Sequence, residues 1–167
     1  RTLARANFGI FEAQHIDTQS GSLRIFCRLN QQHTFDILAQ IAHETDALAS
    51  APARLAEQVA DFRQSLTAFA ESHADHKVAG YGAAAKTVTV LAAAEGRLKL
   101  DCVADAAPSK IGKFLPIGGA PIVSPEELQK RGANPVILFA RNLQKEILPQ
   151  LNTQDVWSPL PTFRRVA

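Results

Sequence analysis

The chain of 167 residues contains no methionine and only two cysteines, and its formal net charge is +2. Because Cys27 and Cys102 stand far apart in the sequence, the chain supplies neither a disulfide framework nor a cysteine-based zinc cluster. The small net charge argues against a nucleic-acid binder, and no apolar run approaches the roughly 18 residues of a membrane span. Since translation begins with methionine, we expect Arg1 to be the start of a processed product or of a fragment.

What is present is the composition of an ordinary globular domain, with 46% hydrophobic and 20% charged residues. Residues 22–29 alternate apolar and polar side chains, which predicts a half-buried strand. The pattern becomes helical from residue 35 to about residue 73, and Ser50-Ala51-Pro52 separates two predicted helices. The large apolar side chains of the second helix form one stripe, which we interpret as a packing face: Leu55, Val59, Phe62, Leu66 and Phe69.

Short apolar runs alternate with helical segments after residue 76. Strands are predicted at 77–81, 98–104, 122–123, 135–140 and 155–160, and helices at 83–94, after Ser124 and at 143–151. Ser124 can cap the middle helix, with Pro125 at its first position and Glu127 closing a capping box. This order predicts an α/β fold, with a Rossmann-like doubly wound, mainly parallel sheet preceded by a strand and a long helical segment.

The first of these strands runs into Gly80-Tyr81-Gly82-Ala83-Ala84-Ala85-Lys86, which fits G-x-G-x-x-G/A between a strand and a helix. Glycines at this place allow a tight turn and bring backbone N–H groups close to an anion, and the helix adds its positive end. Lys86 lies in the first turn, where a cation is unfavourable unless an anion is near. The candidate binding residues here are Gly80, Tyr81, Gly82, Ala83 and Lys86, with a purely structural turn and a solvated lysine as open alternatives.

Asp105 ends the second strand of this alternating region, twenty positions after Ala85. In a dinucleotide-binding unit an acid at this place accepts hydrogen bonds from a ribose, and the alternative is a capping or turn aspartate. The segment 106–121 that follows is long, basic and rich in glycine and proline, and it includes Lys110. Such a loop beside a ligand crevice can cover a phosphate-bearing substrate, or it can be a plain solvated connection.

Catalytic and metal-binding groups are not apparent in the sequence. The five histidines form no Ser-His-Asp arrangement and show no metal-ligand spacing with a cysteine or a second histidine on one helix face. His73 and His76 flank a predicted helix end with Asp75 between them, and we expect no metal site there. The sequence thus predicts a binding crevice without catalytic residues of its own.

Further motifs follow the glycine segment 78–86 in order: Asp105-x-x-Pro108-x-Lys110-x-Gly112, Pro116, Pro121-Ile122, Ser124-Pro125-Glu126-Glu127-Leu128 and Asn142-Leu143-x-x-Glu146-Ile147. Together they resemble the C-terminal domain of SAM-dependent C-methyltransferases that act on nucleotide-linked keto-deoxysugars. Ser22-Leu23-Arg24 is similar to the segment that closes the preceding methyltransferase domain in that family. The resemblance covers roughly residues 18–160 and adds Asn142 to the candidate substrate-binding residues.

Proteins of this kind, the resemblance implies, combine a zinc-binding N-terminal domain, a central SAM-binding domain and this Rossmann-like C-terminal domain. A base removes a proton next to the sugar ketone, and the resulting enolate attacks the methyl group of SAM. The resemblance implies a cytoplasmic enzyme whose SAM is bound by the upstream domain. Its expected partners are a nucleotide-sugar or related phosphorylated substrate and that upstream domain, with a homodimer as a further option, and this fragment alone is not expected to be active.

The resemblance also divides the chain. Residues 1–30 are expected to be the tail of the preceding methyltransferase domain, 31–76 a helical connector packed on the sheet, and 77–167 the Rossmann-like domain. Three sites depart from the family pattern: Gln19-Ser20, where His-Gly is usual, Arg141, where tryptophan is usual, and Thr87, where glycine is common. Two alternatives stay open, a stand-alone NAD(P)- or nucleotide-binding module and a structural domain without a ligand.

Overall fold

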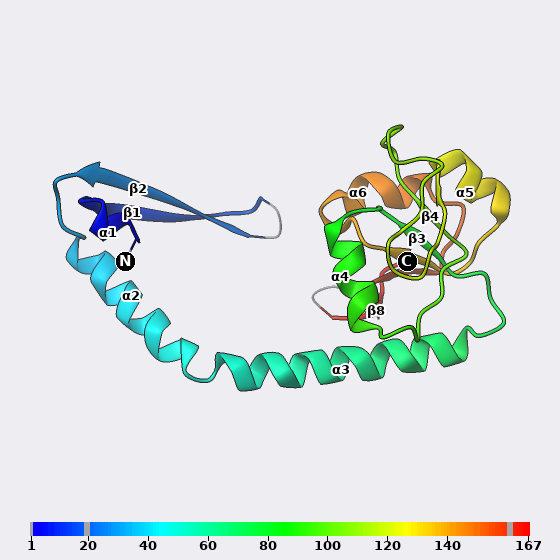
Figure 1. Ribbon diagram of the computed structural model, residues 1–167, viewed down its shortest axis with the longest axis horizontal. Coiled ribbons are helices and arrows are strands. Elements are labelled where there is room, and N and C mark those ends of the chain that lie inside the picture. The colour runs from blue at the N-terminus through cyan, green and yellow to red at the C-terminus, as the bar shows by residue number, and fades with distance from the viewer. Residues whose placement is uncertain (1, 19–20, 160–161) are drawn as a thin grey trace. The chain divides into compact units, whose positions relative to one another are not determined.

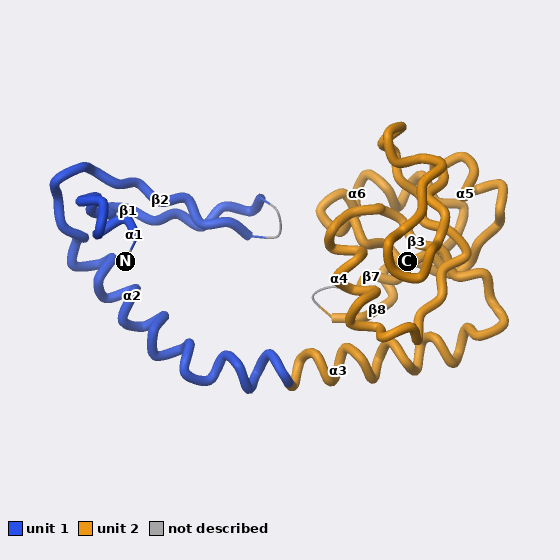
Figure 2. Tube along the Cα trace, in the orientation of Figure 1, with its two compact units in different colours: residues 1–56 blue, residues 57–167 orange. Residues whose placement is uncertain are grey.

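The computed structural model describes residues 2–18, 21–159 and 162–167. Gln19 and Ser20, where the chain departs from the family pattern, therefore lie outside the described residues. Contacts between residues divide the chain into two compact units, residues 1–56 and residues 57–167, and the division falls within one helix (Figure 2). Each unit is described by itself below.

The N-terminal unit is built around a β-hairpin. The short helix α1 (Thr2–Arg5) precedes β1 (Phe8–Ile16), which pairs antiparallel with β2 (Ser22–Leu29) (Figure 1). Strand β2 has the bounds that the alternation predicted, but the prediction of a half-buried strand is wrong for Leu23, Ile25 and Leu29, which are 40–58% exposed. Strand β1 was not predicted. The register of the pair shifts between Ile10 and Glu12, and an extra residue in a strand interrupts the alternation by which strands are found in a sequence.

Two helices follow the hairpin, α2 (Phe35–Leu48) and α3 (Ala51–Ser72). They are separated at the predicted place. The predicted packing face of α3 is confirmed for its second half, where Leu66 and Phe69 are buried and Phe62 is half-buried. In the first half, Leu55 is 61% exposed and Val59 is 37% exposed, so for these two residues the prediction of a packing face is wrong.

The C-terminal unit contains a six-stranded sheet in the order β5-β4-β3-β6-β7-β8. Its strands are β3 (Ala79–Tyr81), β4 (Cys102–Ala104), β5 (Ile122–Val123), β6 (Val136–Leu138), β7 (Val156–Ser158) and β8 (Arg164–Arg165). Neighbouring strands are parallel except for β8, which runs antiparallel to β7. The prediction of a mainly parallel α/β sheet is confirmed. Strand β8 was not predicted, because two exposed arginines carry no strand pattern.

Both faces of this sheet are covered by apolar side chains. Successive residues of a strand point to opposite faces, and β6 accordingly divides its residues between two core clusters. Ile137 joins the cluster that includes Leu66 of α3 and Leu91 of α4 (Ala85–Ala93). Val136 and Leu138 join the cluster that includes residues of the remaining two α-helices, namely Leu128 of α5 (Pro125–Arg131) and Ile147 of α6 (Gln144–Ile147).

Helix ends follow the local chemistry of the sequence. The side chain of Ser124 accepts a hydrogen bond from the N–H of Glu127 at 3.2 Å, which confirms the predicted start of α5. The helix predicted at 143–151 is instead divided into α6 and two 3-10 turns, Arg141–Leu143 and Leu148–Gln150. Pro149 explains the end of α6, because it has no N–H with which to continue the helical hydrogen bonding. No helix in the described part of the chain is long and apolar enough to cross a membrane.

Candidate functional site

The loops after β3, β4 and β6 meet at one edge of the sheet. In the strand order, β4 and β5 lie on one side of β3, while β6 and β7 lie on the other. In open parallel sheets, the crevice at such a reversal lies outside the carboxyl ends of the strands and is the usual ligand site. The residues predicted to bind substrate are on these three strands or in the segments that follow them.

The glycine segment contains two glycines with different tasks. Gly82 has φ +100°, and a Cβ at this position would lie 3.0 Å from the Cβ of Ala140. Gly82 therefore allows a tight turn after β3 that packs against the segment after β6. A Cβ at Gly80 would lie 2.7 Å from the ring of Phe139 and 3.1 Å from Val103. Gly80 thus makes room for core side chains inside the sheet.

Tyr81 and Ala83 are also buried, with 6% and 7% of their surface exposed. Burial raises the pKa of the Tyr81 hydroxyl, and the negative charges of Asp105 and Glu126 raise it further. The phenol is therefore neutral at physiological pH. Ala83 contributes its backbone rather than its side chain, because its N–H donates a hydrogen bond to Asp105 Oδ2 at 2.8 Å.

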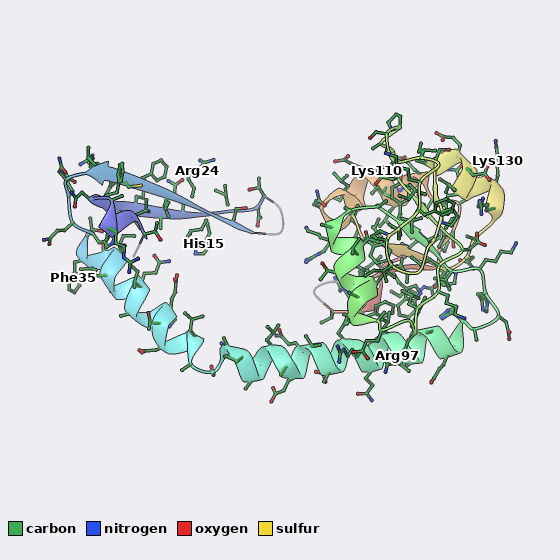
Figure 3. The ribbon with its side chains drawn as sticks, in the orientation of Figure 1. His15, Arg24, Phe35, Arg97, Lys110 and Lys130 are labelled. Carbon is green, nitrogen blue, oxygen red and sulfur yellow. The ribbon has the colours of Figure 1, made fainter. Side chains whose placement is uncertain are left out.

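Asp105 connects the loop after β3 with the loop after β4. Its Oδ2 accepts from the N–H of Ala83 and, at 2.9 Å, from Lys110 Nζ, while its Oδ1 accepts from the N–H of Ala107 at 2.9 Å. Burial raises the pKa of the Asp105 carboxyl, but the hydrogen bonds from Lys110, Ala107 and Ala83 outweigh burial, so the pKa is lowered. The structure thus brings the predicted residues Ala83, Asp105 and Lys110 together. Figure 3 shows Lys110 on the segment after β4.

Thr87 also holds the loop after β3 in place. Sequence reasoning did not identify this residue. Its buried hydroxyl donates to the carbonyl oxygen of Gly82 and accepts from the N–H of Ala84 at 3.4 Å. A threonine at the third residue of a helix that follows a glycine turn was the available signal. In the sequence alone, Thr87 stands out only as a departure from the usual glycine of the family.

Positive groups without a partner remain in the segments that follow β3, β4 and β6. The side chains of Lys86, Lys113 and Arg141 have no ion-pair or hydrogen-bond partner among residues 2–18, 21–159 and 162–167. The backbone N–H groups of Ala85 and Lys86, at the start of α4, also have no acceptor within the described chain. Donors and cations in such an arrangement are suited to an anion.

Asn142 lies in the 3-10 turn Arg141–Leu143 and is exposed. The structure brings it to the same edge as the glycine loop, because Ala140 packs against Gly82. The Asn142 side chain makes no hydrogen bond within the part of the chain that is described. No group of three or more potential metal ligands occurs among the described residues.

The model of the C-methyltransferase C-terminal domain family matches residues 17–158. The match covers most of the chain, and the chain therefore belongs to this family. No curated protein matches the chain. The matched range begins between the two strands of the hairpin, so that β2 lies within the family domain and β1 precedes it.

Proposed function

We propose that this chain is the substrate-side domain of a SAM-dependent C-methyltransferase that acts on a nucleotide-linked keto-deoxysugar. Membership of the C-methyltransferase C-terminal domain family is the observation that carries the proposal. The strand order β5-β4-β3-β6-β7 supports a Rossmann-like wound arrangement for the substrate domain, with the ligand at the carboxyl edge of the strands. A cytoplasmic location and the attached upstream methyltransferase domain are part of the same proposal.

The phosphate groups of the substrate are proposed to bind at the start of α4. Lys86 has no partner in the described structure, and the N–H groups of Ala85 and Lys86 are free to donate. Arg141 follows Ala140, which packs against Gly82, and adds a second unpaired cation. A diphosphate needs this combination of positive charge and hydrogen-bond donors. Asn142, on the same turn as Arg141, is a candidate for polar contacts with the rest of the ligand.

SAM itself does not suit the site that this chain offers. A SAM ribose in a glycine-loop site needs a carboxylate with free acceptor positions, as in dinucleotide-binding units. Here Ala83, Ala107 and Lys110 take three of the roughly four acceptor positions of the Asp105 carboxylate, which leaves too few for the two hydroxyl groups of a ribose. We therefore assign SAM, which supplies the methyl group, to the upstream domain, and we assign no catalytic residue to this chain. Its residues are proposed to bind and orient the nucleotide part of the substrate.

The test is a calorimetric titration of the chain with dTDP, a nucleoside diphosphate that stands for the nucleotide part of the substrate. Lys86→Ala is expected to weaken binding by about tenfold, because a charged hydrogen bond contributes on the order of 1.5 kcal/mol. Lys99→Ala is the matched control, since Lys99 is an exposed lysine that precedes β4 rather than following a strand. Circular dichroism verifies that both variants fold.

Equal affinity of the wild type and Lys86→Ala for dTDP would overturn the phosphate role of Lys86. A titration with NADH, followed by its fluorescence, addresses the alternative of a dinucleotide-binding module. Micromolar NADH binding without dTDP binding would favour that alternative.

A further inference from the structure

A cavity in the N-terminal unit is lined by none of the residues of the proposed phosphate site. Its volume is about 550 Å³, which is within the usual range for small-molecule sites. It is lined by the turn after α1 and by the segment between β2 and α2. The side chains used in the argument below are those of Asn7, Phe8, Asn30, Gln31, Gln32 and His33.

Backbone packing holds this wall in place. A Cβ at Gly9 would overlap the carbonyl oxygens of Gln31 and Gln32, so the segment after β2 lies directly against β1. The N–H of Asn30 donates to the carbonyl oxygen of Asn7 at 2.6 Å. Both asparagines have a positive φ, 59° for Asn7 and 58° for Asn30, a conformation that asparagine adopts more readily than most residues.

His33 presents a defined hydrogen-bond donor. The N–H of Ile10 donates to His33 Nδ1 at 2.9 Å. Because Nδ1 accepts this bond, the proton of the neutral imidazole is on Nε2. Nε2–H has no acceptor among the residues that the structure describes, so it is available to a ligand in the cavity.

The other polar groups of the cavity are carboxamides. The side-chain amides of Asn7, Asn30, Gln31 and Gln32 have no hydrogen-bond partner within the described ranges. Each amide both donates and accepts hydrogen bonds. Phe8 adds an aromatic surface, and none of the described lining residues is Asp, Glu, Lys or Arg.

We propose that this cavity is a binding site for an uncharged polyhydroxyl ligand of monosaccharide size. Hydroxyl groups donate and accept, as carboxamides do, and the apolar face of a pyranose ring can pack on Phe8. An ionised ligand would find no opposite charge on the described walls. None of its described residues belongs to the edge that carries Lys86, so the sugar site and the proposed phosphate site can be tested separately.

The experiment is saturation-transfer NMR on the full chain with D-glucose, D-galactose and L-rhamnose as separate probes. A ligand of this size with a few neutral hydrogen bonds is expected to bind in the millimolar range. The double substitution Gln31→Ala/Gln32→Ala removes two side-chain amides that make no hydrogen bond within the described structure. It is expected to weaken binding of the responding sugar by about tenfold.

Matched controls separate this site from the proposed phosphate site. Gln58→Ala removes an exposed glutamine on α3, outside the cavity, and should leave sugar binding unchanged. Lys86→Ala should also leave it unchanged, even if it abolishes dTDP binding. Gln31→Glu, which keeps the size of the side chain but removes the amide donor, is a second variant expected to weaken binding. Absence of transfer to all three sugars, or equal binding by the double variant, would overturn the proposal.

Discussion

Replacing Asp105 by asparagine keeps the size of the side chain and removes its charge. The native carboxylate accepts from the N–H of Ala83 at 2.8 Å, from the N–H of Ala107 at 2.9 Å and from Lys110 Nζ at 2.9 Å. Since asparagine has only one side-chain oxygen, it can satisfy either Ala83 and Lys110 or Ala107. The NH₂ group of the asparagine then points at an N–H donor, from which it cannot accept a hydrogen bond.

The expected cost follows from these contacts. A hydrogen bond to a charged group contributes about 1.5–3 kcal/mol, and a neutral one about 0.5–1.5 kcal/mol. The side chain of Lys110 is 40% exposed, so its ion pair with Asp105 contributes at most about 1 kcal/mol. Loss of one backbone hydrogen bond and weakening of the others should lower the free energy of unfolding by about 2–3 kcal/mol. The melting temperature should fall by roughly 5–15 °C.

This difference should also depend on pH. The pKa of Asp105 is lowered from the ordinary value of 3.8, because hydrogen bonds from Lys110, Ala107 and Ala83 outweigh the effect of burial. A carboxyl whose pKa is lower in the folded state stabilises the protein above the unfolded-state pKa and loses this effect as the pH falls through the folded-state pKa. The stability difference between the wild type and Asp105→Asn should therefore be constant above about pH 5 and shrink below about pH 4.

Urea unfolding followed by circular dichroism at several pH values measures the effect. Lys110→Ala is the matched control, and it should cost about 1 kcal/mol or less because it leaves both backbone hydrogen bonds in place. Equal stability of the wild type and Asp105→Asn at pH 7 would refute the assignment of Asp105 as the group that connects the two loops. A difference that stays constant into acid would refute the electrostatic part of the reasoning.

Three further substitutions test the local geometry. Gly82→Ala should lower the free energy of unfolding by about 1–3 kcal/mol, because φ is +100° and the new Cβ would press on Ala140; unchanged urea unfolding would contradict this. Gly9→Ala should displace the segment at Gln31 and Gln32 from β1, seen as changed NMR shifts of both residues, whereas shifts confined to Gly9 would contradict the packing. Ser124→Ala should cost about 1 kcal/mol through loss of the α5 cap, and Ser124→Thr should recover most of it in the same unfolding assay.

Sequence reasoning predicted the elements in which the pattern of apolar and polar residues matches the pattern of buried and exposed residues in the structure. Strand β6 is buried on both faces and reads as a continuous apolar run, Val136–Leu138. Strand β1 was missed because the irregularity between Ile10 and Glu12 shifts its alternation. The exposed state of Leu55 could not be predicted, since a helical stripe indicates an apolar face but does not tell how far the covering core extends.

The position of the candidate site could be predicted from the sequence, but most of its hydrogen bonds could not. The place of Asp105, twenty positions after Ala85 at the end of a predicted strand, indicated a site beside the glycine loop, and the parallel pairing of β3 and β4 accounts for it. The partners of Asp105 were not predictable, because the N–H groups of Ala83 and Ala107 are backbone donors whose directions depend on the turns. Thr87 was missed for the same reason, since its partner is the carbonyl oxygen of Gly82.

The contacts of Asp105 also separate the two roles that its spacing left open. If Asp105 accepted hydrogen bonds from a ligand ribose, Asp105→Asn would weaken dTDP binding together with stability. If Asp105 only connects the loops, its negative charge next to the glycine loop opposes a bound anion, and Asp105→Asn should lower stability without weakening dTDP binding. Lys86→Ala should show the reverse, with weaker binding and unchanged stability, because the Lys86 side chain has no partner in the described chain. Calorimetry with dTDP on both folded variants decides between the roles, and parallel losses of affinity would assign Asp105 to the ligand.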